Sequence, residues 1–180
     1  MSASDVPWPA FDDEVVRAMA KWPDVPQCFG WLSLDSRGQW RIQGELIRHP
    51  RAQTFLSRHY RADEHGRWYV QNGPQQVFVD LDYTPWILRW QPDLSFTTHT
   101  GLVTRDLIAV LLDDDGNLLL HTALGVGALD DRCLASCEFL IECDDEDVPQ
   151  TFRWQDRRLT LDRLPRAEVA AHFGFIPRPR

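Results

Sequence analysis

Residues 60–90 read YRADEHGRWYVQNGPQQVFVDLDYTPWILRW, and this segment has the densest aromatic content and the clearest turn signals of the chain. Apolar side chains alternate with their neighbours at positions 68 and 70 and again at 77, 79 and 81, a period that is typical of strands. Between the two runs, Asn72-Gly73 supplies the positive φ that a hairpin turn needs. The segment therefore predicts a β-meander, to which the other elements are added.

The same strand–turn–strand pattern recurs before and after the meander. Alternating apolar positions on either side of polar turns predict further hairpins over residues 30–44, 107–120 and 151–161. The run from Leu107 to Leu112 is apolar on both faces and predicts a central buried strand. Residues 133–143 also alternate, with the cysteines on the apolar face, and predict another strand.

The first helix is predicted over residues 12–22. Asp12 is the expected N-cap, and Phe11 and Val16 occupy the two positions of a hydrophobic staple. Its apolar stripe consists of Val15, Val16, Met19 and Trp22. Two shorter helices are predicted, one from about residue 50 and one from about residue 165.

Together these elements predict an α+β fold dominated by strands. Antiparallel hairpins and a meander form a sheet or a partly open barrel, accompanied by two or three short helices. The turn at Gln91-Pro92-Asp93 is the best boundary, dividing the chain into an N-terminal α+β part, 1–91, and a mostly β part, 92–180. The alternative is one compact domain, because 180 residues bury enough surface to fold without disulfides or metals.

The charge distribution argues against a nucleic-acid partner. The chain has a net charge of −8, and residues 113–147 alone contribute eleven acids against one base. Residues 148–180 are the exception, with seven arginines against three acids. Sequence-independent nucleic-acid binding needs a basic face, so the acidic middle disfavours it.

The sequence predicts a protein of the cytoplasm that has no membrane partner. A basic start followed by an apolar core, as in a signal peptide, is absent from residues 1–30. The longest apolar run, Leu107 to Leu112, is far shorter than the ~20 residues of a membrane helix. The four cysteines are expected to stay reduced, as is usual in the cytoplasm.

Three turns share the frame Asp-x-x-Gly followed by a polar and then an apolar residue. They begin at Asp35, Asp63 and Asp113. An internal repeat would produce this likeness, but so would a common turn that prefers Asp first and Gly fourth. We favour turn chemistry over duplication.

The sequence predicts no metal, no cofactor and no catalytic residue. Cys133 and Cys137 lie in a strand-like pattern, and residues four apart on a strand are ~13 Å apart, too far to share one zinc ion. The acidic run from Asp113 lacks the terminal Glu of a calcium loop. The histidines form no metal-binding pair, no serine lies in a nucleophile elbow, and no glycine-rich phosphate loop is present.

The tryptophans are the best candidates for a binding surface. Most of the eight fall in strand-like segments, so several on one open sheet face would make an aromatic platform or an apolar pocket. Trp86, beside Pro85, is the one expected to be exposed. His99 lies among hydroxyl side chains and is a candidate for orienting a ligand. The predicted ligand-binding residues are Trp68, Trp86, Trp90 and His99.

Four motifs resemble an uncharacterised bacterial family, the one catalogued as DUF2944. They are the segment from Gly30 to Trp40, the Arg-His-Pro run at 48–50, the segment from Gly66 to Gln75, and the Tyr-Thr-Pro-Trp run at 83–86. The resemblance covers residues 28–180, and its Gln-Asn-Gly-Pro run is the most specific part. A looser similarity connects the chain to another uncharacterised bacterial group. Neither resemblance implies a reaction, a cofactor or a partner.

Three hypotheses for the function remain open. The first is a non-catalytic binding or accessory protein, acting on a protein or small molecule through an aromatic sheet face or the acidic surface. The second is an enzyme with an unrecognised site around His99, assisted by Asp80, Asp82 or Asp106. The third is a homo-oligomeric assembly subunit. The first is favoured because many aromatic side chains accompany no recognisable catalytic set.

Overall fold

The computed structural model describes residues 8–180, which form two compact units. Unit 1 comprises the chain up to Pro85 together with residues 174–180, and unit 2 comprises residues 86–173. Strand accounts for 42% of the structure and helix for 21%, so the predicted β-dominated α+β class is confirmed. The expected division after residue 91 stays a prediction about independently folding parts.

Unit 1 is built on a six-stranded mixed sheet in the order β3-β2-β1-β6-β5-β4. The strands are β1 (Cys28–Leu34), β2 (Trp40–Ile42), β3 (Glu45–Leu46), β4 (Tyr60–Ala62), β5 (Trp68–Asn72) and β6 (Gln75–Leu81). The predicted hairpins β1–β2 and β5–β6 are antiparallel, whereas β1 and β6 join them by a parallel pairing. The meander is thus present, and a distant strand completes its sheet.

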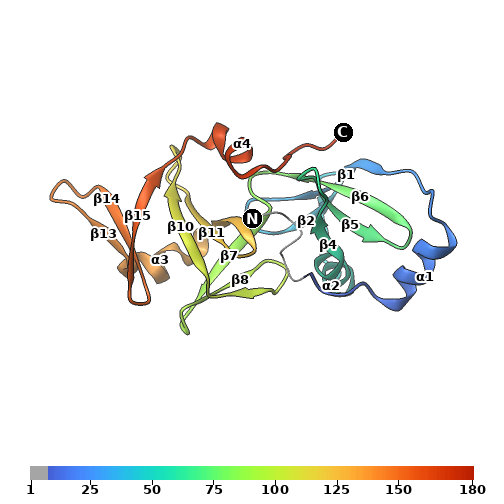
Figure 1. Cartoon of the computed structure of the whole chain (residues 1–180), viewed down its shortest axis with the longest axis horizontal. Coiled ribbons are helices and arrows are strands. Elements are labelled where there is room, and N and C mark those ends of the chain that lie inside the picture. The colour runs from blue at the N-terminus through green and yellow to red at the C-terminus, as the bar shows by residue number, and fades with distance from the viewer. Residues whose placement is uncertain (1–7) are drawn as a thin grey trace. The chain divides into compact units, whose positions relative to one another are not determined.

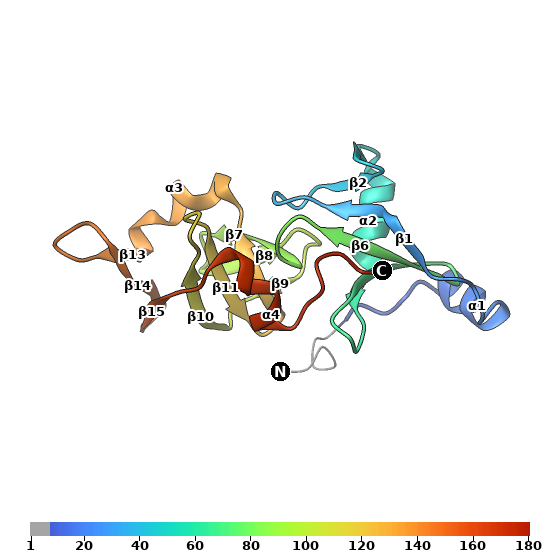
Figure 2. The ribbon, with the colours of Figure 1, turned by 90° about the horizontal axis from the view of Figure 1, so that it is seen from above.

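Helix α2 (Pro50–His59) lies across one face of this sheet (Figure 2). Its first residue is the proline that the sequence placed there. Helix α1 (Asp13–Lys21) is also where it was expected. The details of its start differ from the prediction, because the Asp12 side chain makes no cap hydrogen bond and instead accepts one from Arg58 at 2.9 Å.

The predicted apolar stripe of α1 is only partly buried. Val15 is buried, but Val16 and Trp22 are each about half exposed, at 50% and 51%. Phe11, just before the helix, stacks on the buried ring of His59, with 5.9 Å between ring centroids. The segment that leads into α1 is therefore held at the last turn of α2.

Residues 174–180 return to unit 1 and bind its sheet (Figure 1). The Leu81 amide donates to the Pro177 carbonyl at 2.8 Å, and the Ile176 amide donates to the Gly66 carbonyl at 2.9 Å. Arg178 forms ion pairs with Asp80 and with Asp82. Arg180 forms a further ion pair with Asp80, at 3.0 Å, so the segment is held as far as its last residue.

Unit 2 contains a nine-stranded mixed sheet in the order β13-β14-β15-β10-β11-β12-β7-β8-β9, strongly curled between β7 and β11 (Figure 1). Its strands are β7 (Trp86–Gln91), β8 (Ser95–Thr98), β9 (Val103–Thr104), β10 (Leu107–Leu112), β11 (Leu118–Thr122), β12 (Gly125–Leu129), β13 (Ile141–Cys143), β14 (Pro149–Trp154) and β15 (Arg157–Arg163). The hairpins β10–β11 and β14–β15 are those predicted. A parallel pairing of β10 with β15 joins these two hairpins. A second parallel pairing, of β12 with β7, adds β7, β8 and β9 to the sheet.

The predicted strand over residues 133–143 is wrong. A 3-10 turn (Asp131–Cys133), helix α3 (Leu134–Cys137) and a second 3-10 turn (Glu138–Leu140) fill this segment, and only β13 is extended. Cys137 and Leu140, three residues apart, are buried, whereas Cys143 is exposed. The predicted last helix is confirmed as a 3-10 turn (Arg166–Glu168) that leads into α4 (Val169–Phe173).

The Asp-x-x-Gly frames form one kind of turn. At Asp35, a single carboxylate oxygen accepts from the backbone amides two and four residues later, at 3.0 and 2.9 Å. Asp63 and Asp113 repeat both bonds. Asp144 does the same, although its fourth position holds Asp147 at φ +58° instead of glycine. The shared pattern is explained by the chemistry of this turn, the interpretation that we favoured over an internal repeat.

Candidate apolar binding site

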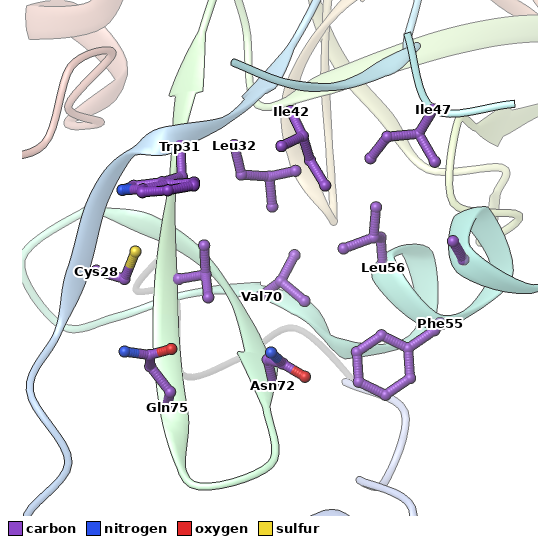
Figure 3. A pocket seen from close by; sticks show the side chains of 12 residues that line it. Cys28, Trp31, Leu32, Ile42, Ile47, Phe55, Leu56, Val70, Asn72 and Gln75 are labelled. Carbon is purple, nitrogen blue, oxygen red and sulfur yellow. The ribbon is translucent and has the colours of Figure 1, made fainter. Parts of the chain in front are cut away.

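Unit 1 contains a concave apolar pocket of about 390 Å³ between its sheet and helix α2 (Figure 3). This volume lies in the range of ligand pockets in proteins. The pocket is lined by Cys28, Trp31, Leu32, Ile42, Ile47, Ala52, Phe55, Leu56, Val70, Asn72, Gln75 and Val77. None of these side chains carries a formal charge, so the pocket suits an uncharged group.

The pleat of the sheet explains the floor of the pocket. Val70 on β5 pairs with Val77 on β6, and Asn72 pairs with Gln75 at the end of the same hairpin. Side chains two residues apart point to the same face, so all four are directed towards α2. Helix α2 has only ten residues, ~15 Å of length, and leaves this part of the face uncovered.

A bulge in β1 directs the side chain of Trp31 towards the pocket. Cys28 pairs with Val77 and Leu32 pairs with Val79, so three residues on β1 lie opposite one on β6. Gly30 is within this bulge at φ +72°, a conformation that glycine adopts at little cost. As a result, consecutive residues Trp31 and Leu32 both line the pocket, which a regular strand would prevent.

The rim of the pocket exposes large apolar side chains. Trp31 is 53% exposed and Ile42 is 47% exposed, whereas Leu32 and Val70 at the floor are buried. Two half-exposed apolar residues around one hollow are a patch that a ligand or partner would bury with a gain in free energy. Apart from the thiol of Cys28, the lining side chains are apolar or carry a neutral amide.

A second hollow lies on the neighbouring flank of α2. It measures about 360 Å³ and is lined by Asp12, Pro50, Arg51, Thr54, Phe55 and Arg58. Phe55 lines both hollows. Its ring packs 4.3 Å from that of His59, which is completely buried beneath it. The wall between the two hollows is therefore anchored in the core.

The four residues predicted to bind a ligand occupy other places. Trp68 is in unit 1 and buried, with its ring 4.8 Å from that of Tyr60. Trp86, Trp90 and His99 are in unit 2, where the rings of Trp86 and His99 are 5.7 Å apart. The expected exposure of Trp86 is wrong, because it is 1% exposed and its indole N–H donates to the Leu124 carbonyl at 2.7 Å. Ligand binding by the four stays a prediction.

Burial keeps His99 neutral. Removal from water, assisted by the nearby positive charge of Arg89, lowers the pKa of His99 to about 3. Its Nδ1 accepts a long hydrogen bond, 3.4 Å, from the Ile87 amide. A general base works best with a pKa near the operating pH, so this imidazole is poorly matched to proton transfer at neutral pH.

Buried carboxylate Asp130 serves a structural purpose in unit 2. It is 1% exposed, and it accepts hydrogen bonds from Arg89 at 3.0 Å and from Arg132 at 2.6 Å. These donors lower the pKa of Asp130 despite the opposing effect of burial. Asp130 therefore remains ionised, fixing the segment that follows β12.

Within residues 8–180, no group of three or more His, Cys, Asp or Glu side chains is arranged to hold a metal ion. No helix in this range is both long and apolar enough to cross a membrane.

Sequence reasoning missed the pocket and its most exposed tryptophan. The signal was Gly30 directly before Trp31, because a glycine inside a strand pattern marks a bulge. Without the distant pairing of β1 with β6, however, the direction of Trp31 was not determined by the local pattern.

One known protein family matches almost the whole chain. The sequence model of DUF2944, described as a protein of unknown function (DUF2946), matches residues 11–180. The chain belongs to this family. The resemblance seen in its motifs is thereby confirmed over almost the whole length. No curated protein matches this DUF2944 chain by sequence.

Two solved structures are similar to this DUF2944 protein. A DUF1285 family protein from Silicibacter pomeroyi DSS-3 is 19% identical, with a TM-score of 0.56 over 87% of this chain and 89% of that one. A DUF1285 family protein from Shewanella baltica OS155 is 17% identical, with a TM-score of 0.44 over 59% of this chain and 88% of that one. The first likeness concerns the fold alone.

Proposed function

We propose that this DUF2944 protein is a non-catalytic binding protein whose pocket in unit 1 holds a small apolar ligand. The observation that carries the proposal is the pairing of an apolar hollow of about 390 Å³ with a half-exposed tryptophan at its rim. The hollow is concave, and most of its lining residues belong to the sheet. Its uncharged lining favours hydrocarbon or aromatic groups over charged metabolites.

The state of the cysteines supports a cytoplasmic location for this protein. Cys28, Cys133, Cys137 and Cys143 are all free thiols. Thiols persist in that form where the compartment is reducing, which supports the location expected from the sequence. Cys28 itself lines the pocket and adds a small apolar surface there.

The test uses a neutral dye, N-phenyl-1-naphthylamine, whose fluorescence rises in an apolar site. The wild-type protein is expected to bind it saturably. Trp31→Ala removes part of the rim and should weaken binding by about 1–2 kcal/mol, roughly 5- to 30-fold. Ala52→Phe places a ring in the hollow from α2 and should block the dye.

Trp22→Ala is the matched control. Trp22 is 51% exposed, nearly the same as Trp31, but it follows α1 and does not line the pocket. The Trp22 variant should bind like wild type, and the urea midpoints of the Trp22 and Trp31 variants should lie close to that of wild type. Equal loss of binding in both variants, or undiminished binding in Ala52→Phe, would refute the pocket as the site.

A further inference from the structure

The two hollows beside α2 adjoin at Phe55 and differ in the chemistry of their linings. Successive helix residues are rotated by ~100°, so Arg51, Thr54 and Arg58 share one flank while Ala52 and Leu56 share another. Phe55 falls between these flanks and lines both hollows. A ligand that leaves the apolar pocket past Phe55 thus meets the two arginines.

The second hollow carries an excess positive charge. Arg51 and Arg58 line it against a single acid, Asp12. Arg58 pairs with Asp12 at 2.9 Å, with both side chains substantially exposed. Such a surface pair contributes little and is easily rearranged. Within residues 8–180, Arg51 has no ion pair or hydrogen bond, so its charge is available to a ligand.

The apolar pocket is itself polarised along its length. Among the described residues that line it, Asn72 and Gln75 carry the amide side chains, and they are neighbours across the β5–β6 hairpin. Figure 3 shows both amides and Phe55 at one end of the pocket, with Trp31, Leu32 and Ile42 towards the other. Polarity therefore increases in the direction of the arginines.

We propose that the ligand is a free amphiphile with a hydrocarbon body and one carboxylate, of the fatty-acid class. The body occupies the apolar pocket, and the carboxylate lies beyond Phe55 beside Arg51 and Arg58. One anionic group matches the single excess charge of that hollow. This inference rests on the proposed function and adds the charge of the ligand to it.

The experiment compares decanoate with decanol, which share a chain and differ in the head group. Each displaces the neutral dye from the protein at concentrations below those at which micelles form. Arg51→Gln should weaken decanoate by about 2- to 5-fold, and adding Arg58→Gln should weaken it further, as expected for exposed charge pairs. Both variants should bind decanol within 2-fold of wild type. High salt should weaken decanoate selectively.

Arg48→Gln is the control for net charge. Arg48 is exposed, precedes α2 and lines neither hollow, so its variant should bind both amphiphiles as wild type does. If decanol binds normally and Arg51→Gln leaves decanoate unchanged, the carboxylate assignment is overturned while the proposed function stands. If the dye binds but neither amphiphile displaces it, the inference is overturned while the pocket stays a site for apolar ligands. If the dye itself does not bind, the proposed function falls as well. Displacement only by an acidic amphipathic peptide would assign the site to a protein partner and overturn the inference.

Discussion

The four aspartate turns show how one side chain determines a local structure. Each carboxylate accepts two backbone amides, and each turn places its fourth residue in the left-handed region. Three of those fourth residues are glycines, while the last is Asp147 at φ +58°. The sequence identified the first three because glycine marks the position. It missed the fourth because an aspartate there gives no such signal.

This difference predicts a reciprocal pair of variants. Asp147→Gly should stabilise the protein by ~0.5–1 kcal/mol, because glycine adopts the left-handed region without steric cost. Gly116→Asp should destabilise it by a similar amount, since Gly116 is at φ +82° and a Cβ there meets no atom within 4 Å. Urea denaturation measures both. Changes of the same sign in the two variants would contradict the account.

His99 predicts a pH dependence of unit 2. The pKa of His99 is about 3 in the folded state against about 6.5 in the unfolded chain, so the unfolded chain binds more protons between these values. Its contribution to stability is complete above pH 6.5 and is lost as the pH falls towards 3. The free energy of unfolding should drop by up to ~1.4 kcal/mol per pH unit.

Hydrogen exchange of amides in β10 to β12 at pH 7 and at pH 5 measures this slope before most carboxylates titrate. His99→Gln should make it shallower, and burial of His121 on β11, which also lowers the pKa of that residue, contributes to what remains. The exposed His65, with 64% of its side chain accessible, provides the control His65→Gln, which should keep the slope. An undiminished slope in His99→Gln would mean that another group carries it.

At the level of elements, turn residues predicted the hairpins correctly, whereas the sequence did not predict which distant strands pair. The hairpins were predicted because a few adjacent residues, such as Asn72-Gly73, specify each turn. The three parallel pairings join strands far apart in sequence, and no residue pattern specifies them. The pocket depends on one of these pairings, β1 with β6, which explains why its residues were not predicted as a group.

The segment 133–143 was misassigned because two periods fit it. Cys133 and Cys137 are compatible with alternation and also with the four-residue spacing of a helix. Strict alternation places Leu134 and Leu140 on the polar face. Leu140 is buried together with Cys137, three residues earlier, which the helical spacing explains and alternation does not.

The C-terminal segment predicts a specific role for Gly66. A Cβ at Gly66 would overlap the Gly174 carbonyl, and Gly66 has φ +75°. Gly44 has a similar φ, +83°, but open space around it. Gly44→Ala should cost ~1–2 kcal/mol from backbone strain alone. Gly66→Ala should cost a further ~1–3 kcal/mol, because the terminal segment must move.

Hydrogen exchange distinguishes the two effects. The Leu81 amide is bonded to the Pro177 carbonyl, so Gly66→Ala should expose it to exchange while Gly44→Ala leaves it protected. Equal protection of Leu81 in both variants would show that the segment tolerates the added methyl group without moving.

At the scale of the whole molecule, the chain enters unit 1, forms unit 2 and returns to unit 1. No composition shift marks the change at residue 85, because Thr84-Pro85 is only a short interruption between strands. The turn at residues 91–93 carries a stronger local signal but lies inside unit 2, between β7 and β8. Contacts made along the sheet, rather than turn residues, define the units.

A boundary after residue 85 and a boundary after residue 91 make opposite predictions for isolated fragments. Strand β7 lies between β12 and β8, and its residues Trp86, Ile87 and Leu88 are 1%, 0% and 0% exposed. A fragment of residues 92–180 lacks all three. Each contributes about 1.5–3 kcal/mol by burial, so their loss rivals the ~5–15 kcal/mol stability of a typical domain. Residues 86–173 retain the complete nine-stranded sheet.

We therefore expect fragment 86–173 to unfold cooperatively in urea and to give dispersed amide NMR signals, and fragment 92–180 to do neither. The complete chain provides the reference spectrum, in which the unit 2 signals should match those of fragment 86–173. A folded fragment 92–180 would instead support the boundary after residue 91. That result would mean that β8 and β9 pack without β7, which their pairing does not favour, since β8 pairs only with β7 and β9 and β9 pairs only with β8 among the described residues.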